Sequence, residues 1–220
     1  IPMATSSASS ASSARRKRAE ESFVSAAETI GRIEKGMALF AVTRGQWSML
    51  DALLYCVDML GAGAAVSIWT WTIAEYEVAQ FERLLARRDL VAASLIIDMA
   101  ADRKAPHLIR RWREAFGPDS VRVCRSHAKI ARVWAGDMRL LLRGSMNLNF
   151  NPRFEQFDLT EGGADYDLVE RIEAELPVLH APYTFAEVAA ASKLRRAFTD
   201  DVLALFGDLG NLNEIEATEI

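Results

Sequence analysis

Segments with the spacing of buried strands alternate with segments with the spacing of amphipathic helices along most of the chain. The expected strands span residues 37–43, 65–73, 91–99, 120–125, 127–134, 138–143 and 157–160. The expected helices span residues 20–35, 47–60, 74–88, 106–117, 165–179 and 186–206. Strand–helix alternation favours parallel pairs, whereas the turn Ala135-Gly136-Asp137 joins two strands as an antiparallel hairpin. The pattern therefore predicts an α/β sandwich, a mixed β-sheet flanked by helices on both faces.

The 220 residues, half of them apolar, suffice for one domain with a substantial core, which we expect over residues 23–206. Residues 1–22 are rich in Ser and Ala and then basic, which predicts a disordered tail, and residues 207–220 are expected to form a C-terminal tail. No apolar run reaches the roughly 18–20 residues needed to span a bilayer, and no secretory signal is recognisable. We therefore expect a cytoplasmic protein with no membrane span.

Charge is distributed unevenly along the sequence. Residues 101–143 carry 11 Lys and Arg against four Asp and Glu, whereas residues 144–220 carry five against 15. A local excess of positive charge attracts polyanions even though the whole chain has a net charge of −4. We expect Arg125, Arg132 and Arg143 in this stretch to contact an anionic substrate. For Arg143, an ion pair with an acid remains the alternative.

Cysteine and histidine are too sparse to suggest a metal centre. The chain has two cysteines, Cys56 in an expected helix and Cys124 in an expected strand, which support neither a disulfide framework nor a zinc site. Its three histidines are His107, His127 and His180, far apart in the sequence. We expect the chain to work without a metal or another cofactor.

One of these histidines belongs to the pattern H-x-K, an apolar stretch, then G-S-x-N. Residues two apart on a strand point to the same face, so His127 and Lys129 are expected to project side by side. The same period places Ser145 and Asn147 together, directly after Gly144. An imidazole, an ammonium, a hydroxyl and an amide would then converge, a set suited to holding and attacking a phosphodiester without a metal.

This combination resembles the phospholipase D superfamily, whose motif is H-x-K-x4-D followed by G-S/G-x-N. The residues that match it are His127, Lys129, Gly144, Ser145 and Asn147. The order of strands and helices over residues 37–180 is similar to that of the family, and residues match specifically across 127–155. The stretch around the second motif looks most like small phospholipase D-like proteins of phages and prophages.

The chain departs from the family pattern at one position. The family's aspartate would fall at Trp134, and the nearest aspartate, Asp137, lies three residues later in the expected turn. That aspartate is generally structural in the family, so its absence puts the turn in doubt more than the chemistry. An acidic residue that orients the histidine is usual downstream, and Glu155 occupies the comparable place, with Gln156 as the alternative.

The resemblance implies a mechanism and an assembly. In the family two H-x-K motifs meet at one site, where one histidine attacks phosphorus and the other protonates the leaving oxygen. This chain has one motif, so the resemblance implies a homodimer with the active site on its two-fold axis. Lys129 and Asn147 would hold the phosphate oxygens, Ser145 and Gly144 would support them, and Glu155 would orient His127. The implied activity is that of a metal-independent phosphodiesterase, an endonuclease acting on DNA, with RNA left open.

Three alternatives remain from the sequence. The missing aspartate would suit a non-catalytic DNA-binding or assembly protein with this fold, although intact His127 and Lys129 argue against it. A phospholipid-hydrolysing enzyme would need an exposed apolar docking face. Trp69 and Trp71 could supply one together with Trp134, but their alternation on an expected strand favours the core. Finally, His127 of a purely structural α/β domain would be buried and satisfied.

Overall fold

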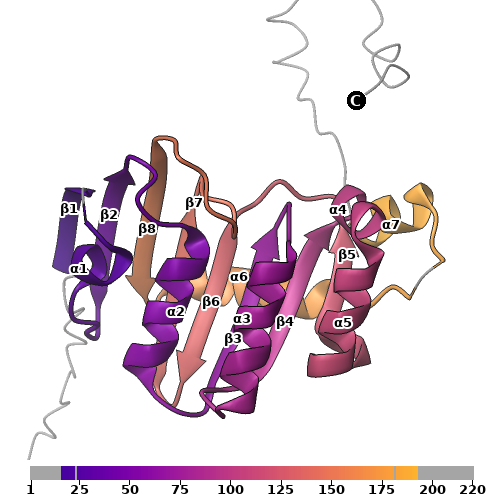
Figure 1. The fold of residues 1–220 in the computed structure, drawn as a ribbon, viewed down its shortest axis with the longest axis horizontal. Helices are drawn as coiled ribbons and strands as arrows, with labels where there is room; N and C mark the ends of the chain where they lie inside the picture. The colour runs from indigo at the N-terminus through magenta and orange to yellow at the C-terminus, as the bar shows by residue number, and fades with distance from the viewer. Residues whose placement is uncertain (1–15, 23, 181, 193–220) are drawn as a thin grey trace, which may run out of the picture.

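A computed structural model describes residues 16–22, 24–180 and 182–192 and contains an eight-stranded sheet with the strand order β1-β2-β8-β7-β6-β3-β4-β5 (Figure 1). The strands are β1 (Arg16–Ser22), β2 (Met37–Thr43), β3 (Ala64–Thr70), β4 (Leu90–Asp98), β5 (Val121–Cys124), β6 (Ile130–Ala135), β7 (Met138–Gly144) and β8 (Glu155–Glu161). The helices are α1 (Ala26–Ile30), α2 (Met49–Leu60), α3 (Glu75–Ala86), α4 (Met99–Lys104), α5 (Pro106–Phe116), α6 (Ala164–Glu175) and α7 (Phe185–Ala191).

The sheet is mixed, which confirms the α/β class expected from the sequence. Strands β1 and β2, and β3, β4 and β5, pair in parallel, whereas β2–β8, β8–β7, β7–β6 and β6–β3 are antiparallel. As a result, β2, β3, β4, β5 and β7 end at the same edge of the sheet at which β6 and β8 begin, the upper edge in Figure 1. Loops from distant parts of the sequence therefore meet at this edge.

Helices cover both faces of the sheet, as the alternating pattern predicts. The helices α2, α3 and α5 pack on the near face in Figure 1, and α6 lies behind the sheet. The main core lies between the sheet and α2, α3 and α5, and it includes Leu53, Phe81 and Trp112, each fully buried. A smaller cluster under α6 contains Leu141 and Tyr166. Apolar burial of this extent supplies most of the driving force for folding.

Local sequence accounts for two features that support the site. Ser48 and Asp51 form a capping box that starts α2, with the Ser48 N–H donating to the Asp51 carboxylate at 2.7 Å. Ala135 pairs with Met138, so the expected hairpin has the two-residue turn Gly136-Asp137. Gly136 adopts a φ of 56°, which glycine tolerates without steric cost. The hairpin prediction is thereby confirmed.

The N-terminal part differs from the sequence prediction. Residues 16–22 of the expected disordered tail instead form β1, paired in register along β2 from Arg16 and Met37 onwards. The helix expected over residues 20–35 is reduced to α1. Backbone hydrogen bonds hold an edge strand without requiring apolar side chains, so composition does not reveal it. The Arg18 guanidinium also donates to the Ile30 carbonyl at 2.7 Å, which ties β1 to the end of α1.

The remaining terminal predictions lie outside the described residues. These are the tail over residues 1–15, the part of the expected helix over 186–206 that follows residue 192, and the tail over 207–220. The domain boundary at 206 accordingly stays a prediction, whereas β1 extends the sheet to the N-terminal side of residue 23. Within the described residues, no helix combines the length and the apolar character needed to cross a membrane.

Candidate active site

The segment that carries the H-x-K motif is a loop, not the start of a strand. Strand β6 begins at Ile130, so residues 125–129 lead from the end of β5 past β4 and β3 to β6 along the upper edge of the sheet (Figure 1). The Asp98 carboxylate at the end of β4 accepts the Ser126 N–H at 3.0 Å, and the Ser126 hydroxyl accepts the Ala128 N–H at 3.1 Å. These bonds, rather than strand geometry, set the direction of the motif.

Nevertheless the two motif side chains are in contact. The Lys129 Nζ lies 2.9 Å from Nδ1 and 3.1 Å from Nε2 of His127, and it donates to the His127 carbonyl at 2.8 Å. Their environments are opposite, because His127 is exposed whereas Lys129 is 7% exposed. Burial lowers the pKa of the Lys129 ammonium, and the negative charge of Glu155 opposes that shift.

The second motif is fastened to the beginning of β8. The Ser145 hydroxyl donates to the Glu155 carboxylate and accepts the Gln156 N–H at 2.9 Å. The Ser145 N–H in turn donates to the Gln156 carbonyl at 3.0 Å. A hydroxyl and a carboxylate are thus held together at the edge where Lys129 lies, because the Gly144 N–H, next to Ser145, donates to the Lys129 carbonyl.

Of the two residues expected to orient the histidine, Glu155 lies at the site and Gln156 does not. The Gln156 amide donates to Asp158, which follows two residues later on β8 and so faces the same side of the sheet. Glu155 takes its hydrogen bond from Ser145 rather than from His127. Orientation of His127 by Glu155 therefore stays a prediction.

Gly144 has a backbone role that differs from the expected contact with substrate. A Cβ at this position would lie 2.1 Å from the Gln156 carbonyl oxygen, so only glycine permits β7 and β8 to come this close. The Gly144 N–H donates to the Lys129 carbonyl at 3.2 Å and is therefore not available to a phosphate. Gly144 thus joins the two motifs and leaves the binding of substrate to the side chains around it.

Asn147 lies in the loop after β7, which the N-terminus of α2 holds. The Met49 N–H donates to the Asn147 carbonyl and the Leu50 N–H to the Leu148 carbonyl, both at 3.3 Å. These are backbone donors that the first turn of a helix leaves unpaired. The Asn147 side-chain Oδ1 is buried and has no hydrogen-bond partner among the described residues. A buried acceptor without a partner is costly to stability.

The structure places Arg132 and Arg143 away from the motif side chains, whereas Arg125 is exposed on the loop that carries the H-x-K motif, so its contact with substrate stays a prediction. Arg132 is 6% exposed and lies under α6, where its Nε donates to Glu173 at 2.9 Å. Arg143 pairs with Asp165 at the start of α6 at 2.8 Å, the alternative that the sequence left open. The Arg125 guanidinium stacks 4.6 Å from the ring centroid of Phe185 on α7. Carboxylates of α6 thus neutralise three basic residues of the predicted stretch, Arg132, Arg139 and Arg143.

Opposite faces of the sheet explain the error for Arg132 and Arg143. Both reach α6, as does Ile130, which packs against the apolar cluster beneath that helix. Lys129 precedes Ile130, and successive side chains alternate between the faces of an extended segment. The ammonium thus lies on the other side from the two arginines. Trp134 stacks on Arg132 at the far end of β6, so the residue at the family's aspartate position is remote from the site.

Trp71 is a residue of the site that the sequence prediction placed in the core. Strand β3 ends at Thr70, so Trp71 extends beyond the sheet and is 37% exposed. Its ring centroid lies 5.4 Å from that of His127, with an angle of 55° between the planes. Trp69, by contrast, donates from its indole N–H to Glu173 under α6 at 2.8 Å. Knowledge that β3 ends at Thr70 would have placed Trp71 outside the core, but periodicity in the sequence locates strand ends poorly.

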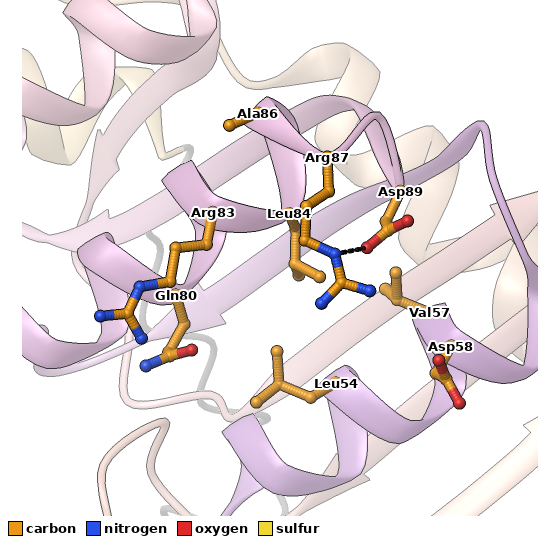
Figure 2. A pocket seen from close by; sticks show the side chains of 9 residues that line it. All are labelled: Leu54, Val57, Asp58, Gln80, Arg83, Leu84, Ala86, Arg87 and Asp89. Atoms are coloured by element: carbon orange, nitrogen blue, oxygen red, sulfur yellow. Dashed lines mark ion pairs between the residues drawn. The ribbon is translucent and has the colours of Figure 1, made fainter.

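A pocket of about 490 Å³ elsewhere on the surface is distinct from this site. It lies between α2 and α3, and Figure 2 shows the ion pair of Arg87 with Asp89 among its charged side chains. The second half of α2 lines it, whereas the first residues of α2 contact the loop that contains Asn147. Among the described residues, no group of three or more His, Cys, Asp or Glu side chains is arranged to hold a metal ion.

Comparisons with known proteins show only distant structural similarity. No protein-family model and no curated protein matches the chain. Similar solved structures include polyphosphate kinase from Porphyromonas gingivalis, with a TM-score of 0.45, 14% identity and coverage of 62% of this chain and 25% of that chain. For phosphatidylserine synthase from Haemophilus influenzae Rd KW20 the TM-score is 0.39 and the identity 14%, with coverage of 62% of this chain and 37% of that chain. For the archaeal chromatin protein TrmBL2, described as having a novel mode of DNA binding, the TM-score is 0.38 and the identity 9%. The similarity covers 64% of this chain and 51% of that chain.

The chain therefore spans between a quarter and about half of the length of these structures. At this level of similarity the comparisons carry no argument about its chemistry.

Proposed function

We propose that the chain is a metal-independent phosphodiester hydrolase of the phospholipase D type, an endonuclease with DNA as its substrate. The observation that carries this proposal is the contact of the exposed His127 ring with the buried Lys129 ammonium, beside Ser145 and Glu155. An exposed imidazole can reach a substrate, and a desolvated cation beside it stabilises charge that develops on a phosphate. A histidine with a purely structural role would be buried.

In the proposed reaction a His127 ring nitrogen attacks phosphorus, an N–P bond forms and the bond to the leaving oxygen breaks. The protonated His127 of a second copy gives its proton to that oxygen and becomes neutral. It then accepts a proton from water, whose oxygen attacks phosphorus while the N–P bond breaks. Lys129 and the Asn147 amide would hold the non-bridging oxygens throughout.

This reaction needs two imidazoles, and one chain provides a single H-x-K motif. We therefore propose an isologous homodimer in which each His127 faces its copy. The exposure of His127 supports an arrangement in which the site is completed from outside the chain. Because one imidazole must be neutral and the other protonated, we expect a bell-shaped dependence of kcat on pH.

Two exposed cations near the site support a polyanionic substrate. Lys104 ends α4, directly above the sheet edge, and Arg153 precedes Glu155 by two residues. Within the described part of the chain neither has a carboxylate partner, so both can attract backbone phosphates. Phe150 and Phe154, which are 57% and 67% exposed, favour a second candidate, hydrolysis of phospholipids at a membrane surface.

Cleavage of plasmid and single-stranded DNA in excess EDTA tests the proposal. We expect the wild type to cut DNA under chelation, and His127→Ala to abolish cutting with an unchanged dimer mass by ultracentrifugation. His107→Ala is the matched control, because His107 is an exposed histidine on α5, beside Glu75 at 3.4 Å. Acid-labile radiolabel retained on the wild type after a rapid quench would identify the phosphohistidine.

The outcomes separate the alternatives. Cutting that persists in His127→Ala would refute the proposed chemistry. Tight DNA binding without cutting by any variant would favour a binding or assembly protein. Release of a head group from phosphatidylcholine vesicles in place of DNA cutting would favour the phospholipid reaction.

A further inference from the structure

We propose that Trp71 binds an unpaired nucleobase of the substrate by stacking, so that the strand is single-stranded where it is cut. This inference rests on the proposed function and names the form of nucleic acid that the site accepts. The observations behind it are the position of the Trp71 indole, the anchoring of its backbone and the charge beside it.

The backbone on either side of Trp71 is held firmly. The Thr70 hydroxyl donates to the Thr72 carbonyl at 2.7 Å and accepts the Thr72 N–H at 3.3 Å, so a tight turn encloses Trp71. The Thr72 hydroxyl donates to Asn149 Oδ1 at 2.8 Å, which links this turn to the loop that contains the second motif. The indole is thus presented at a defined place with little backbone freedom to lose on binding.

The Trp71 indole is not part of the hydrophobic core. Trp71 is 37% exposed, and its ring contact in the described structure is with His127, at 5.4 Å between centroids. A large aromatic side chain left partly in water beside a catalytic imidazole retains a surface on which a planar group can stack. A base on this surface would bring its own phosphodiester towards His127.

An ammonium lies next to the same ring. The Lys104 Nζ is 5.9 Å from the Trp71 ring centroid, and Lys104 has no carboxylate partner among the described residues. Arg111 on α5, by contrast, pairs with Glu75 and Glu82. The Lys104 ammonium lies over the ring, and when this flexible side chain swings aside the ring can take a base while the ammonium takes its phosphate, which together match a nucleotide.

The same geometry selects against duplex DNA. In a duplex each base is stacked on both faces by its neighbours, so the indole can reach a base only after that base is unstacked. Unstacking costs a few kcal/mol in a duplex and much less in a single strand. The stacking site therefore predicts faster cutting of single strands than of duplexes, and it predicts that Trp71 is responsible for the difference.

The test compares kcat/KM for an oligothymidylate and for a fully abasic strand of the same length, in EDTA. Trp71→Ala is expected to lower kcat/KM on the oligothymidylate by about 10- to 100-fold, the range for loss of one stacked base. On the abasic strand we expect a change of less than about twofold, because no base is present to stack. Trp71→Phe should restore most of the rate, and Phe40→Ala, an exposed aromatic on β2, is the control.

Equal slowing on both strands would overturn the inference, because Trp71 would then act on His127 and not on a base. A dimeric wild type together with a monomeric Trp71→Ala variant would also overturn the inference, because the indole would then lie in the subunit interface. Loss of binding to phosphatidylglycerol vesicles, without any difference between the two strands, would assign Trp71 to a lipid surface.

Binding separates this inference from the proposed function. If the wild type cuts neither strand, the proposed hydrolysis fails, and fluorescence anisotropy of labelled strands still tests the stacking. Tighter binding of the oligothymidylate than of the abasic strand, lost in Trp71→Ala, would support base stacking in a binding protein. Equal binding of both strands by wild type and variant would refute it.

Discussion

Replacement of Gly144 by alanine tests the most specific structural claim about the site, that β7 and β8 approach too closely for any side chain. The added Cβ would lie 2.1 Å from the Gln156 carbonyl oxygen and 3.2 Å from the Phe157 Cα. An ordinary C···O contact is about 3.3 Å, so the two strands must separate by roughly 1 Å. Phe157 is fully buried, and its backbone cannot move without disturbing the core.

The expected cost follows from what this separation breaks. Overpacking against backbone costs about 1–3 kcal/mol. The two hydrogen bonds between Ser145 and Gln156, at 3.0 and 2.9 Å, contribute roughly 0.5–1.5 kcal/mol each. We therefore expect Gly144→Ala to lower the free energy of unfolding by about 3 kcal/mol, or the Tm by roughly 6–12 °C. Cleavage per folded molecule should also fall, because Ser145 and Glu155 move away from Lys129.

Urea denaturation followed by tryptophan fluorescence measures the loss of stability. Gly117→Ala is the matched control, since a Cβ there meets nothing within 4 Å and the φ of 98° leaves only a conformational cost of about 1–2 kcal/mol. The control should keep full cleavage per folded molecule. A loss below about 1 kcal/mol in Gly144→Ala, with cleavage intact, would refute the close approach as a requirement of the site.

Three further predictions concern buried groups. Because burial lowers the pKa of the Lys129 ammonium, the unfolded chain holds this proton more tightly, and stability rises as the pH rises from the lowered pKa towards the ordinary pKa of lysine. Lys129→Met should therefore stabilise the protein at neutral pH, and less so at higher pH, while abolishing cleavage. Urea titrations from neutral to alkaline pH measure this gain, and a less stable variant would contradict the reasoning. Arg132→Met should cost about 3–5 kcal/mol by leaving the buried Glu173 carboxylate without a cation. The double change Arg132→Met/Glu173→Leu should recover most of this loss, and neither variant should alter cleavage per folded molecule. Burial raises the pKa of Cys56 and of Cys124 to about 12, so neither thiol should react with Ellman's reagent at pH 8 until urea unfolds the protein; rapid labelling of the native state would contradict their burial.

Periodicity in the sequence predicted most of the sheet correctly. Strand β2 has the bounds expected from the sequence, residues 37–43, and the hairpin that joins β6 to β7 lies where the turn residues indicated. These elements depend on apolar spacing and turn residues within a few positions of one another. Strand β1 was missed because an edge strand is defined by its hydrogen bonds to β2 and not by its own composition.

The motif residues were also found, but not the way in which they meet. His127 and Lys129 are in contact on a loop that Asp98 holds from the end of β4, not on a strand. The alternation of side chains along a strand predicted that His127 and Lys129 would be adjacent. It could not predict which face of the sheet α6 would cover. The arginine at 132 was therefore placed at the site, although Glu173 holds it on the other face.

The sequence by itself determined the fold class, the order of most elements and the identity of the motif side chains, because each depends on spacing within one segment. Only the tertiary structure decided which groups share the site. The contact of Trp71 with His127 joins the ends of β3 and β5, and the contact of Gly144 with Gln156 joins β7 to β8. Such contacts depend on strand order and on which face each helix covers, and packing of the whole chain sets both.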